Sequence, residues 1–261
     1  MTLFKHELRQ NRIALAIWTA AISFMLGICV LIYPEMSSQM GDISKMFADM
    51  GSFSSAFGMD QLNFGEFMGY FGVECGNVLG LGGAFFAAIT GITLLAKEEK
   101  EHTADFLFPH PISRVSVITS KYLSMVAQIV ILNATVILVT TVSILAIQER
   151  PDIKAMALLY AAYFVLQIEI GTISFGISAF LKGNGLGVGL GLSFILYFLN
   201  IVSNLTEDAK FLKYITPFGY AEGSYIIPNN SIEWKYMAVG IAFIIIGIAA
   251  AYIRYSEKDI S

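Results

Sequence analysis

Six long stretches of this sequence carry almost no charge, and each is long enough to form a helix that crosses a membrane. Such a helix needs about 20 apolar residues to cross roughly 30 Å of hydrocarbon. Five stretches lack Asp, Glu, Lys and Arg: they hold 22 residues after Arg12, 22 after Glu74, 27 after Lys121, 24 after Lys182 and 18 after Lys235. The sixth lies between Lys154 and Lys182 and contains one acid, Glu169. Because 56% of the residues are hydrophobic and 14% are charged, we expect a membrane protein.

The pattern predicts an all-α membrane protein that forms one transmembrane domain over residues 1–261. The expected spans are 14–32, 78–96, 118–147, 155–181, 186–202 and 236–253. Outside the spans, we expect an N-terminal interfacial helix, a short cytoplasmic helix between the second and third spans, and amphipathic or re-entrant elements on the outer side. Six spans place both termini on the same side of the membrane.

The distribution of Lys and Arg orients these spans, because basic residues are enriched in cytoplasmic connections. The side that holds the termini would carry ten of the 16 basic residues, and the other side six. We therefore expect a multi-pass protein of the plasma membrane with both termini in the cytoplasm. The net charge of −4 gives no basic surface of the kind that nucleic acid requires, so we exclude nucleic acid as a partner.

The N-terminal residues have an amphipathic pattern. Leu3, Phe4 and Leu8 fall near one helical face, while Lys5 and Arg9 can reach water and lipid headgroups. The pattern predicts an interfacial helix that leads into the first span. The alternative is a positively charged flank that only orients this span.

Two connections on the expected outer side are predicted to have structure of their own, and the first, residues 33–74, is too apolar for a free loop. Residues 33–74 are rich in Met and Phe, which predicts short amphipathic helices at the membrane surface. The methionines could instead bind copper(I), a soft ion, although no His or Cys lies among them. Residues 203–235 contain Pro217 and Pro228 within segments too short to span, which predicts a re-entrant or interfacial pair covered by protein.

Glycines recur at four-residue intervals at the start of the fifth span. One row contains Gly183, Gly187 and Gly191, and another contains Gly185 and Gly189. Small residues at this spacing let helices approach closely. A phosphate-binding loop is the alternative, but no strand precedes the glycines and no Lys-Ser or Lys-Thr pair follows them.

No motif in the sequence indicates catalysis. There is no HExxH, no G-x-S-x-G and no P-loop, and the three histidines lie near the expected cytoplasmic surface without the spacing of a site. Cys29 and Cys75 are predicted to be packing residues rather than metal ligands. We therefore expect no catalytic residue, no metal site and no cofactor bound by this chain.

Several polar residues fall inside the spans, and they are candidates for a translocation pathway. Glu169 lies near the middle of the fourth span, where an ionised carboxylate is costly unless it is paired or wet. Gln128, Asn133 and Gln167 are its nearest polar neighbours by expected depth. We expect a protonated or water-contacting acid that faces the bundle interior. It would either contact substrate or carry protons, or it would join two helices through hydrogen bonds.

The charged stretch between the second and third spans, residues 94–114, predicts a short helix in the cytoplasm. Thr103 can cap it, Asp105 suits its positive N-terminal end, and Pro109 disfavours its continuation. The helix would carry Phe106, Leu107 and Phe108 out of the membrane. Three consecutive large apolar side chains need lipid or a protein groove.

This stretch resembles the signature of ABC-2 type ATP-binding-cassette exporter permeases, and the six-span order and the long first outer connection resemble that family too. The residues that carry the resemblance are Glu98, Glu99, Thr103, Asp105, Leu107, Pro111, Ile112, Ser113 and Arg114, with Lys121 after them. The chain departs from the pattern at His102, where the family has glycine, and at Phe106 and Phe108 among the leucines.

The resemblance implies that this short element is a coupling helix that lies in a groove of a separate ATPase subunit. Glu98, Glu99, Phe106, Phe108, Pro111, Ser113 and Arg114 would then contribute to ATPase coupling together with Thr103, Asp105 and Leu107. ATP and Mg²⁺ would bind in the partner subunit, and a second permease chain, identical or related, would complete the membrane part.

The expected function is outward transport of an amphipathic or hydrophobic cargo, such as a peptide, an antibiotic or a lipid. One alternative is a permease that serves a copper-related assembly outside the cytoplasm or at the cell surface. Another is a membrane scaffold or sensor that transports nothing.

Overall fold

The computed structural model describes residues 2–37, 51–63, 65–100, 113–181, 183 and 185–257. All regular structure in these residues is helical. The long helices are α2 (Arg12–Ser37), α6 (Gly82–Lys100), α8 (Arg114–Ala146), α9 (Ile153–Ser178), α10 (Leu186–Leu205) and α12 (Trp234–Glu257). The short elements are α1 (Thr2–Gln10), α4 (Ser52–Ala56), η1 (Met59–Gln61), α5 (Phe67–Cys75), η2 (Gly76–Leu81), η3 (Glu207–Tyr214), η4 (Pro217–Tyr220) and α11 (Gly223–Asn229).

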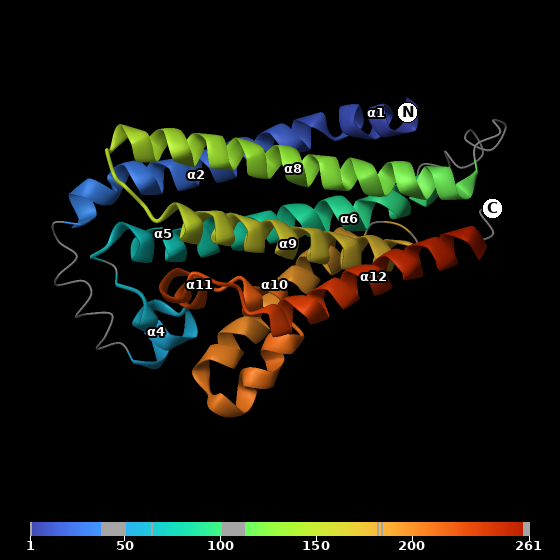
Figure 1. Cartoon of the computed structure of the whole chain (residues 1–261). Helices are drawn as coiled ribbons and strands as arrows, with labels where there is room; N and C mark the ends of the chain where they lie inside the picture. Colours follow the sequence, from blue (N-terminus) through green and yellow to red (C-terminus); the bar gives the residue numbers. More distant parts are fainter. Residues whose placement is uncertain are drawn as a thin grey trace.

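Six helical segments of the described residues are long and apolar enough to cross a membrane, which confirms the predicted all-helical, six-span fold. They lie side by side along one direction, with the N-terminus and the last turns of α12 at the same end of the bundle (Figure 1). We call this the terminal end. The other, which holds α4, η3 and α11, is the opposite end.

The second span is longer than the uncharged stretch predicts. It starts at Phe67 and ends at Leu95, because α5, η2 and α6 follow one another without a break. In the sequence, the uncharged stretch begins only after Glu74, because this residue is charged. In the structure, Glu74 is only half-exposed, and it accepts a hydrogen bond from the Cys29 thiol on α2 at 3.6 Å. A carboxylate with a hydrogen-bond partner on a neighbouring helix therefore does not interrupt the span.

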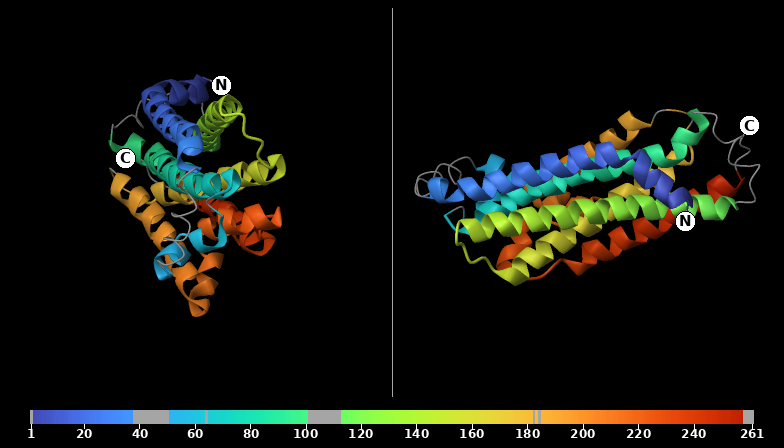
Figure 2. Two further views of the ribbon diagram at one scale, coloured as in Figure 1. Left: turned by 90° about the vertical axis from the view of Figure 1, so that its left-hand side faces the viewer. Right: turned by 90° about the horizontal axis from the view of Figure 1, so that it is seen from above.

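The core of the bundle is built on α6 and α9. Figures 1 and 2 show this pair in the middle, with α2 and α8 on one side and α10 and α12 on the other. The two helices approach so closely at Gly91 that a Cβ atom there would run into the carbonyl oxygen of Gly171. Small residues at such crossings bring helix backbones into contact, which is the main source of packing energy between helices in lipid.

The connection between α10 and α12 folds into short helical turns that pack into the bundle. Thr216 begins this fold, because its hydroxyl donates to the Leu196 carbonyl at 2.7 Å and accepts from the Phe218 N–H at 3.4 Å. All four residues of η4 are buried. The buried turn η4 has the short, protein-covered form that the sequence predicts for this connection, whereas no residue of η3 is buried.

The described part of the first long connection includes the short elements α4 and η1. That they lie at the membrane surface stays a prediction. Met40, Met46 and Met50 of the methionine-rich segment lie outside the described residues. Among the residues that the structure describes, no group of three or more His, Cys, Asp or Glu side chains could hold a metal ion.

Candidate functional site

Most of the candidate coupling residues fall between α6 and α8. Thr103, Asp105, Phe106, Leu107, Phe108 and Pro111 lie outside the described residues, as do the side chains of Glu98 and Glu99. The described part begins again at Ser113, whose hydroxyl caps α8 by accepting a hydrogen bond from the Ser116 N–H at 3.2 Å. Arg114 is the first residue of this helix. The candidate coupling segment is therefore bounded by two helix ends at the terminal end of the bundle.

A buried ion pair ties these two helices to α1. The Lys121 ammonium lies 2.7 Å from Glu7 Oε1 and donates to the Leu94 carbonyl of α6 at 2.9 Å. Only 3% of the Lys121 side chain and 7% of the Glu7 side chain are exposed. We call these three residues the Lys121 junction. Because α8 has 33 residues and is about 50 Å long, its first turns can reach beyond the hydrocarbon.

Sequence reasoning identified Lys121 through the resemblance but missed Glu7. The predicted faces of α1 are otherwise as expected, since Lys5 and Arg9 are exposed and Leu3 is half-buried. Glu7 lies one turn after Leu3 on the same face. An acid on the apolar face of an amphipathic helix indicates a buried basic partner, so this pattern could have identified Glu7.

Two of the four candidate pathway residues meet each other. Asn133 of α8 donates to the side-chain oxygen of Gln167 on α9 at 2.6 Å, and Gln167 donates to the Leu79 carbonyl of η2 at 3.3 Å. Gln128 instead bonds within its own helix, to the Ser124 carbonyl at 3.2 Å. Asn133 and Gln167 thus join three membrane segments through buried hydrogen bonds.

Glu169 lies apart from this pair. Its side chain is 1% exposed, and it accepts a hydrogen bond from the Tyr220 hydroxyl of η4 at 2.8 Å. On α12, Gly240 leaves room for the carboxylate, because a Cβ atom at this position would collide with it. Burial, with the nearby Glu169 as a second cause, raises the pKa of Tyr220 well above its ordinary value, which keeps this phenol a hydrogen-bond donor.

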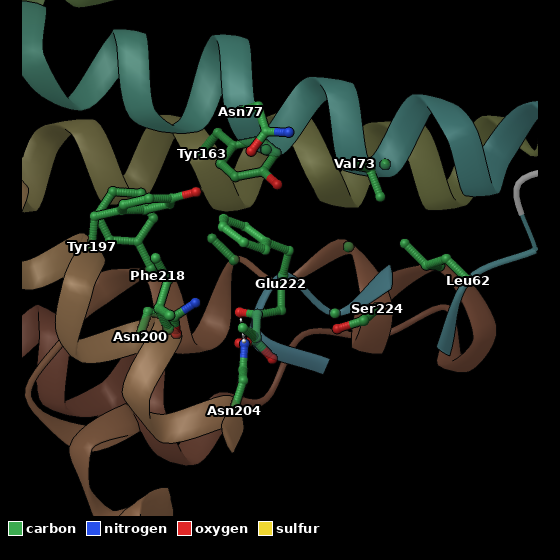
Figure 3. Close-up of a pocket in the computed structure, with 18 residues that line it drawn as sticks. Leu62, Val73, Asn77, Tyr163, Tyr197, Asn200, Asn204, Phe218, Glu222 and Ser224 are labelled. Atoms are coloured by element: carbon green, nitrogen blue, oxygen red, sulfur yellow. Dashed lines mark hydrogen bonds between the residues drawn. The ribbon is translucent and has the colours of Figure 1, made fainter. Parts of the chain in front are cut away.

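A pocket at the opposite end gathers polar and aromatic side chains (Figure 3). It encloses about 560 Å³, counting the open space at its mouth. Its walls come from α4, α5, η2, α9, α10, η4 and α11, and include Asn77, Tyr163, Tyr197, Asn200, Asn204, Phe218, Glu222 and Ser224. We call it the Glu222 pocket. None of the four candidate pathway residues lines it.

A second cavity is an apolar groove between α9, α10 and α12. Ile177, Phe180, Leu192 and Phe243 are among its lining residues, and all of the described residues that line it are apolar or Gly. It lies where a hydrophobic molecule could contact three spans at once. Sequence reasoning predicted neither cavity, because each is assembled from segments that are distant in the chain.

The comparisons with known proteins agree with the arrangement of the spans. No curated protein matches this chain. A family model described as ABC-2 family transporter protein matches residues 1–260. Six spans and a match over this length show that the chain belongs to the ABC-2 family and is the membrane permease component of an ABC transporter rather than its ATPase.

Proposed function

We propose that this chain is one half of the membrane part of an ATP-driven exporter. Two such chains, identical or related, would bind two cytoplasmic ATPase subunits that hold ATP and Mg²⁺. The terminal end would face the cytoplasm. The cargo would be an amphipathic or hydrophobic molecule, such as a peptide, an antibiotic or a lipid, and alternating access would move it outward.

The Lys121 junction is the observation that carries this proposal. It joins α1, α6 and α8 just behind the two helix ends that bound the candidate coupling segment. A force on residues 101–112 would therefore act on three elements together rather than bend one loop. Because α6 packs backbone to backbone on α9 at Gly91 and Gly171, the displacement would pass on to the centre of the bundle.

The two cavities support the choice of cargo. The groove lined by Ile177, Leu192 and Phe243 offers an apolar surface to a hydrophobic part. The Glu222 pocket offers polar groups at the opposite end of the bundle. A cargo with an apolar body and a polar head would suit the two cavities in turn.

The test replaces Phe106 and Phe108 by Ala and measures how much ATPase subunit the purified chain retains in detergent. Aromatic anchors in a protein groove commonly contribute about 2 kcal/mol or more each, which is roughly a thirtyfold loss of affinity per ring. We expect the ATPase to dissociate while the thermal unfolding temperature of the permease alone stays unchanged. Phe211→Ala, which truncates a ring that is 62% exposed on η3, is the matched control and should retain the partner.

Two results would contradict the proposal. If the double variant still binds its ATPase and couples ATP hydrolysis to transport, residues 106–108 do not form the contact. If the chain purifies from its native membrane without any ATPase subunit, a non-transporting scaffold or sensor becomes the better reading.

A further inference from the structure

The Glu222 pocket contains two buried polar groups that lack partners among the described residues. The Asn200 side-chain oxygen and one carboxylate oxygen of Glu222, Oε1, have no hydrogen bond within this part of the chain. Asn200 is 8% exposed, and 10% of the Glu222 side chain is exposed. Buried polar groups in proteins are nearly always satisfied. Seven buried side-chain atoms of the described residues lack a partner, and these two are the ones that share a pocket, where a ligand can reach both residues.

Both unsatisfied atoms are hydrogen-bond acceptors. The other carboxylate oxygen of Glu222, Oε2, already accepts from the Lys213 ammonium at 2.6 Å, so Oε1 is the one left over. A ligand for these atoms must bring donors. A primary ammonium group has three N–H donors and no acceptor, whereas a hydroxyl group has one donor. An ammonium therefore has enough donors for both atoms, whereas a hydroxyl has enough for one.

The rest of the pocket suits the same chemistry. Tyr163, Tyr197 and Phe218 line it, and the rings of Tyr197 and Phe218 meet edge to face at 5.2 Å. Aromatic faces attract cations. Leu62 and Val73 line it as well, and they provide apolar contact for a short alkyl chain (Figure 3).

The nearby charges leave Glu222 as the recognition group. Among the residues that the structure describes, it is the one charged residue that lines the pocket. Glu207 and Lys210 pair with each other at 2.6 Å on η3, where both are largely exposed. A cation that enters the pocket would thus share Glu222 with Lys213 in a buried setting, where charge-assisted hydrogen bonds are strong.

The pocket also has room for such a group. It encloses about 560 Å³, counting the open space at its mouth. The π-helical turn of η2 contributes Gly76 and Asn77 to the wall, and a Cβ atom on Gly76 would lie 3.0 Å from the Tyr163 hydroxyl. π-Helical turns inside α-helices often mark functional sites.

We propose that the Glu222 pocket binds the primary ammonium group of an amphipathic amine. Glu222 and Asn200 accept its N–H donors, and the aromatic and aliphatic walls contact its first carbons. The ammonium can come from the ethanolamine headgroup of a lipid or from a free or peptide-borne amine. Binding stands independently of the exporter proposal, because it requires neither the ATPase nor transport.

The test uses the purified full chain in nanodiscs of phosphatidylcholine, a lipid without a primary amine. Saturation-transfer NMR titrations compare n-butylammonium with n-butanol, which has the same chain but a single donor. We expect n-butylammonium to bind at least tenfold more tightly than n-butanol. Glu222→Gln should weaken the binding of n-butylammonium at least tenfold, and the control Glu207→Gln should leave its affinity unchanged.

Asn200→Ala is the second variant, because it removes an unsatisfied acceptor without touching the ion pair of Lys213. It should weaken binding of n-butylammonium severalfold and keep the thermal unfolding temperature, which preserves the test if Glu222→Gln does not fold. The proposal is overturned if n-butylammonium binds no better than n-butanol, or if Glu222→Gln and Glu207→Gln have the same affinity.

A second lipid identifies the source of the amine. If a lipid headgroup occupies the pocket, nanodiscs of phosphatidylethanolamine will compete and lower the apparent affinity for n-butylammonium. If the natural amine is soluble or belongs to a peptide, the affinity will be the same in both lipids. Either result supports an ammonium site and assigns its ligand.

Discussion

At the scale of single residues, the structure contains both a buried and an exposed ion pair. Lys121 and Glu7 are taken almost fully out of water, whereas Lys210 and Glu207 form their pair in solvent with side chains that are 54% and 83% exposed. Exposed pairs contribute little to stability, because water already solvates both partners. Removing one partner of a buried pair is costly, because the remaining charge is buried and has neither water nor a counter-ion to solvate it.

Lys121→Met should therefore destabilise the protein by about 3–5 kcal/mol, because it leaves the Glu7 carboxylate buried without its base. Thermal unfolding of the purified chain measures the change. Lys210→Met is the matched control and should shift stability by less than about 1 kcal/mol. The double variant of Lys121→Met with Glu7→Gln should regain part of the loss. Equal effects of Lys121→Met and Lys210→Met on unfolding would show that the Lys121 junction does not stabilise the fold.

Tyr220 and Glu169 form another buried polar contact between residues that are distant in the sequence. Tyr220→Phe removes the hydroxyl that donates to the carboxylate at 2.8 Å and leaves a buried acceptor unsatisfied. We expect a loss of about 1–3 kcal/mol in unfolding free energy. Tyr214→Phe, at a ring that is 44% exposed, is the control and should be neutral. An equal response of the two variants would mean that Glu169 draws its stability from elsewhere.

Glu169→Gln separates a structural role from a functional one, because the amide keeps the shape and hydrogen bonding of the acid but does not titrate. We expect the variant to assemble normally while its substrate-stimulated ATP hydrolysis changes in the complex with the ATPase. If transport by the variant and by the wild type has the same dependence on pH, Glu169 only joins α9 to η4 and α12.

At the scale of elements, the glycines decide which helices touch. A Cβ atom on Gly91 would overlap the Gly171 carbonyl, whereas one on Gly187 would have nothing within 4 Å. The sequence predicted two rows of small residues on α10 for close packing. In the structure, Gly185 and Gly189 pack against Ile92 of α6, and the other row, with Gly187, has open space around it.

Gly91→Ala should push α6 away from α9 and cost about 1–3 kcal/mol through overpacking. Gly187→Ala makes the same chemical change on an open helix face, so it should stabilise α10 by about 0.5–1 kcal/mol. The opposite signs make the pair of variants a test of packing rather than of helix propensity. Thermal unfolding in the same detergent provides both values. If Gly91→Ala is as benign as Gly187→Ala, the two backbones do not touch.

The number and class of the elements could be read from the sequence because they depend on local composition. Uncharged stretches identified all six spans, and only the second was misplaced, since a charge with a partner such as Glu74 does not end a helix. Which helices meet depends on tertiary packing. The contact of Glu169 with Tyr220 joins residues 51 positions apart, and no local pattern indicates it.

At the scale of the whole molecule, the two ends of the bundle differ. The helices α9 and α12 run in the same direction, because Glu169 faces Gly240 and, seven residues later in each helix, Gly176 faces Gly247. In this register α9 extends well beyond the first turn of α12 at the opposite end. The turns η3, η4 and α11 fill the space that α12 leaves there (Figure 1). Residues of α9, η4 and α11 line the Glu222 pocket at this end, and none of the described residues of α12 does.

The asymmetry makes the orientation of the molecule a decisive measurement, and cysteine labelling in intact cells provides it. Asn229 and Arg150 are exposed at the opposite end, and Gln10 is exposed at the terminal end. Ser54 is on the outer side by sequence, but it is only 1% exposed and so is unsuitable for labelling. The native thiols are replaced first, Cys75 by Ala because it is fully buried and Cys29 by Ser to keep a donor to Glu74.

A membrane-impermeant thiol reagent added outside the cells should label cysteines at Asn229 and Arg150, and should label a cysteine at Gln10 only after permeabilisation. The expectation rests on the excess of basic residues at the terminal end, which favours the cytoplasmic side. The reverse pattern would place the Glu222 pocket in the cytoplasm and residues 101–112 outside, beyond the reach of any ATPase. Labelling at all three positions without permeabilisation would mean that the spans do not form one bundle with two separate ends.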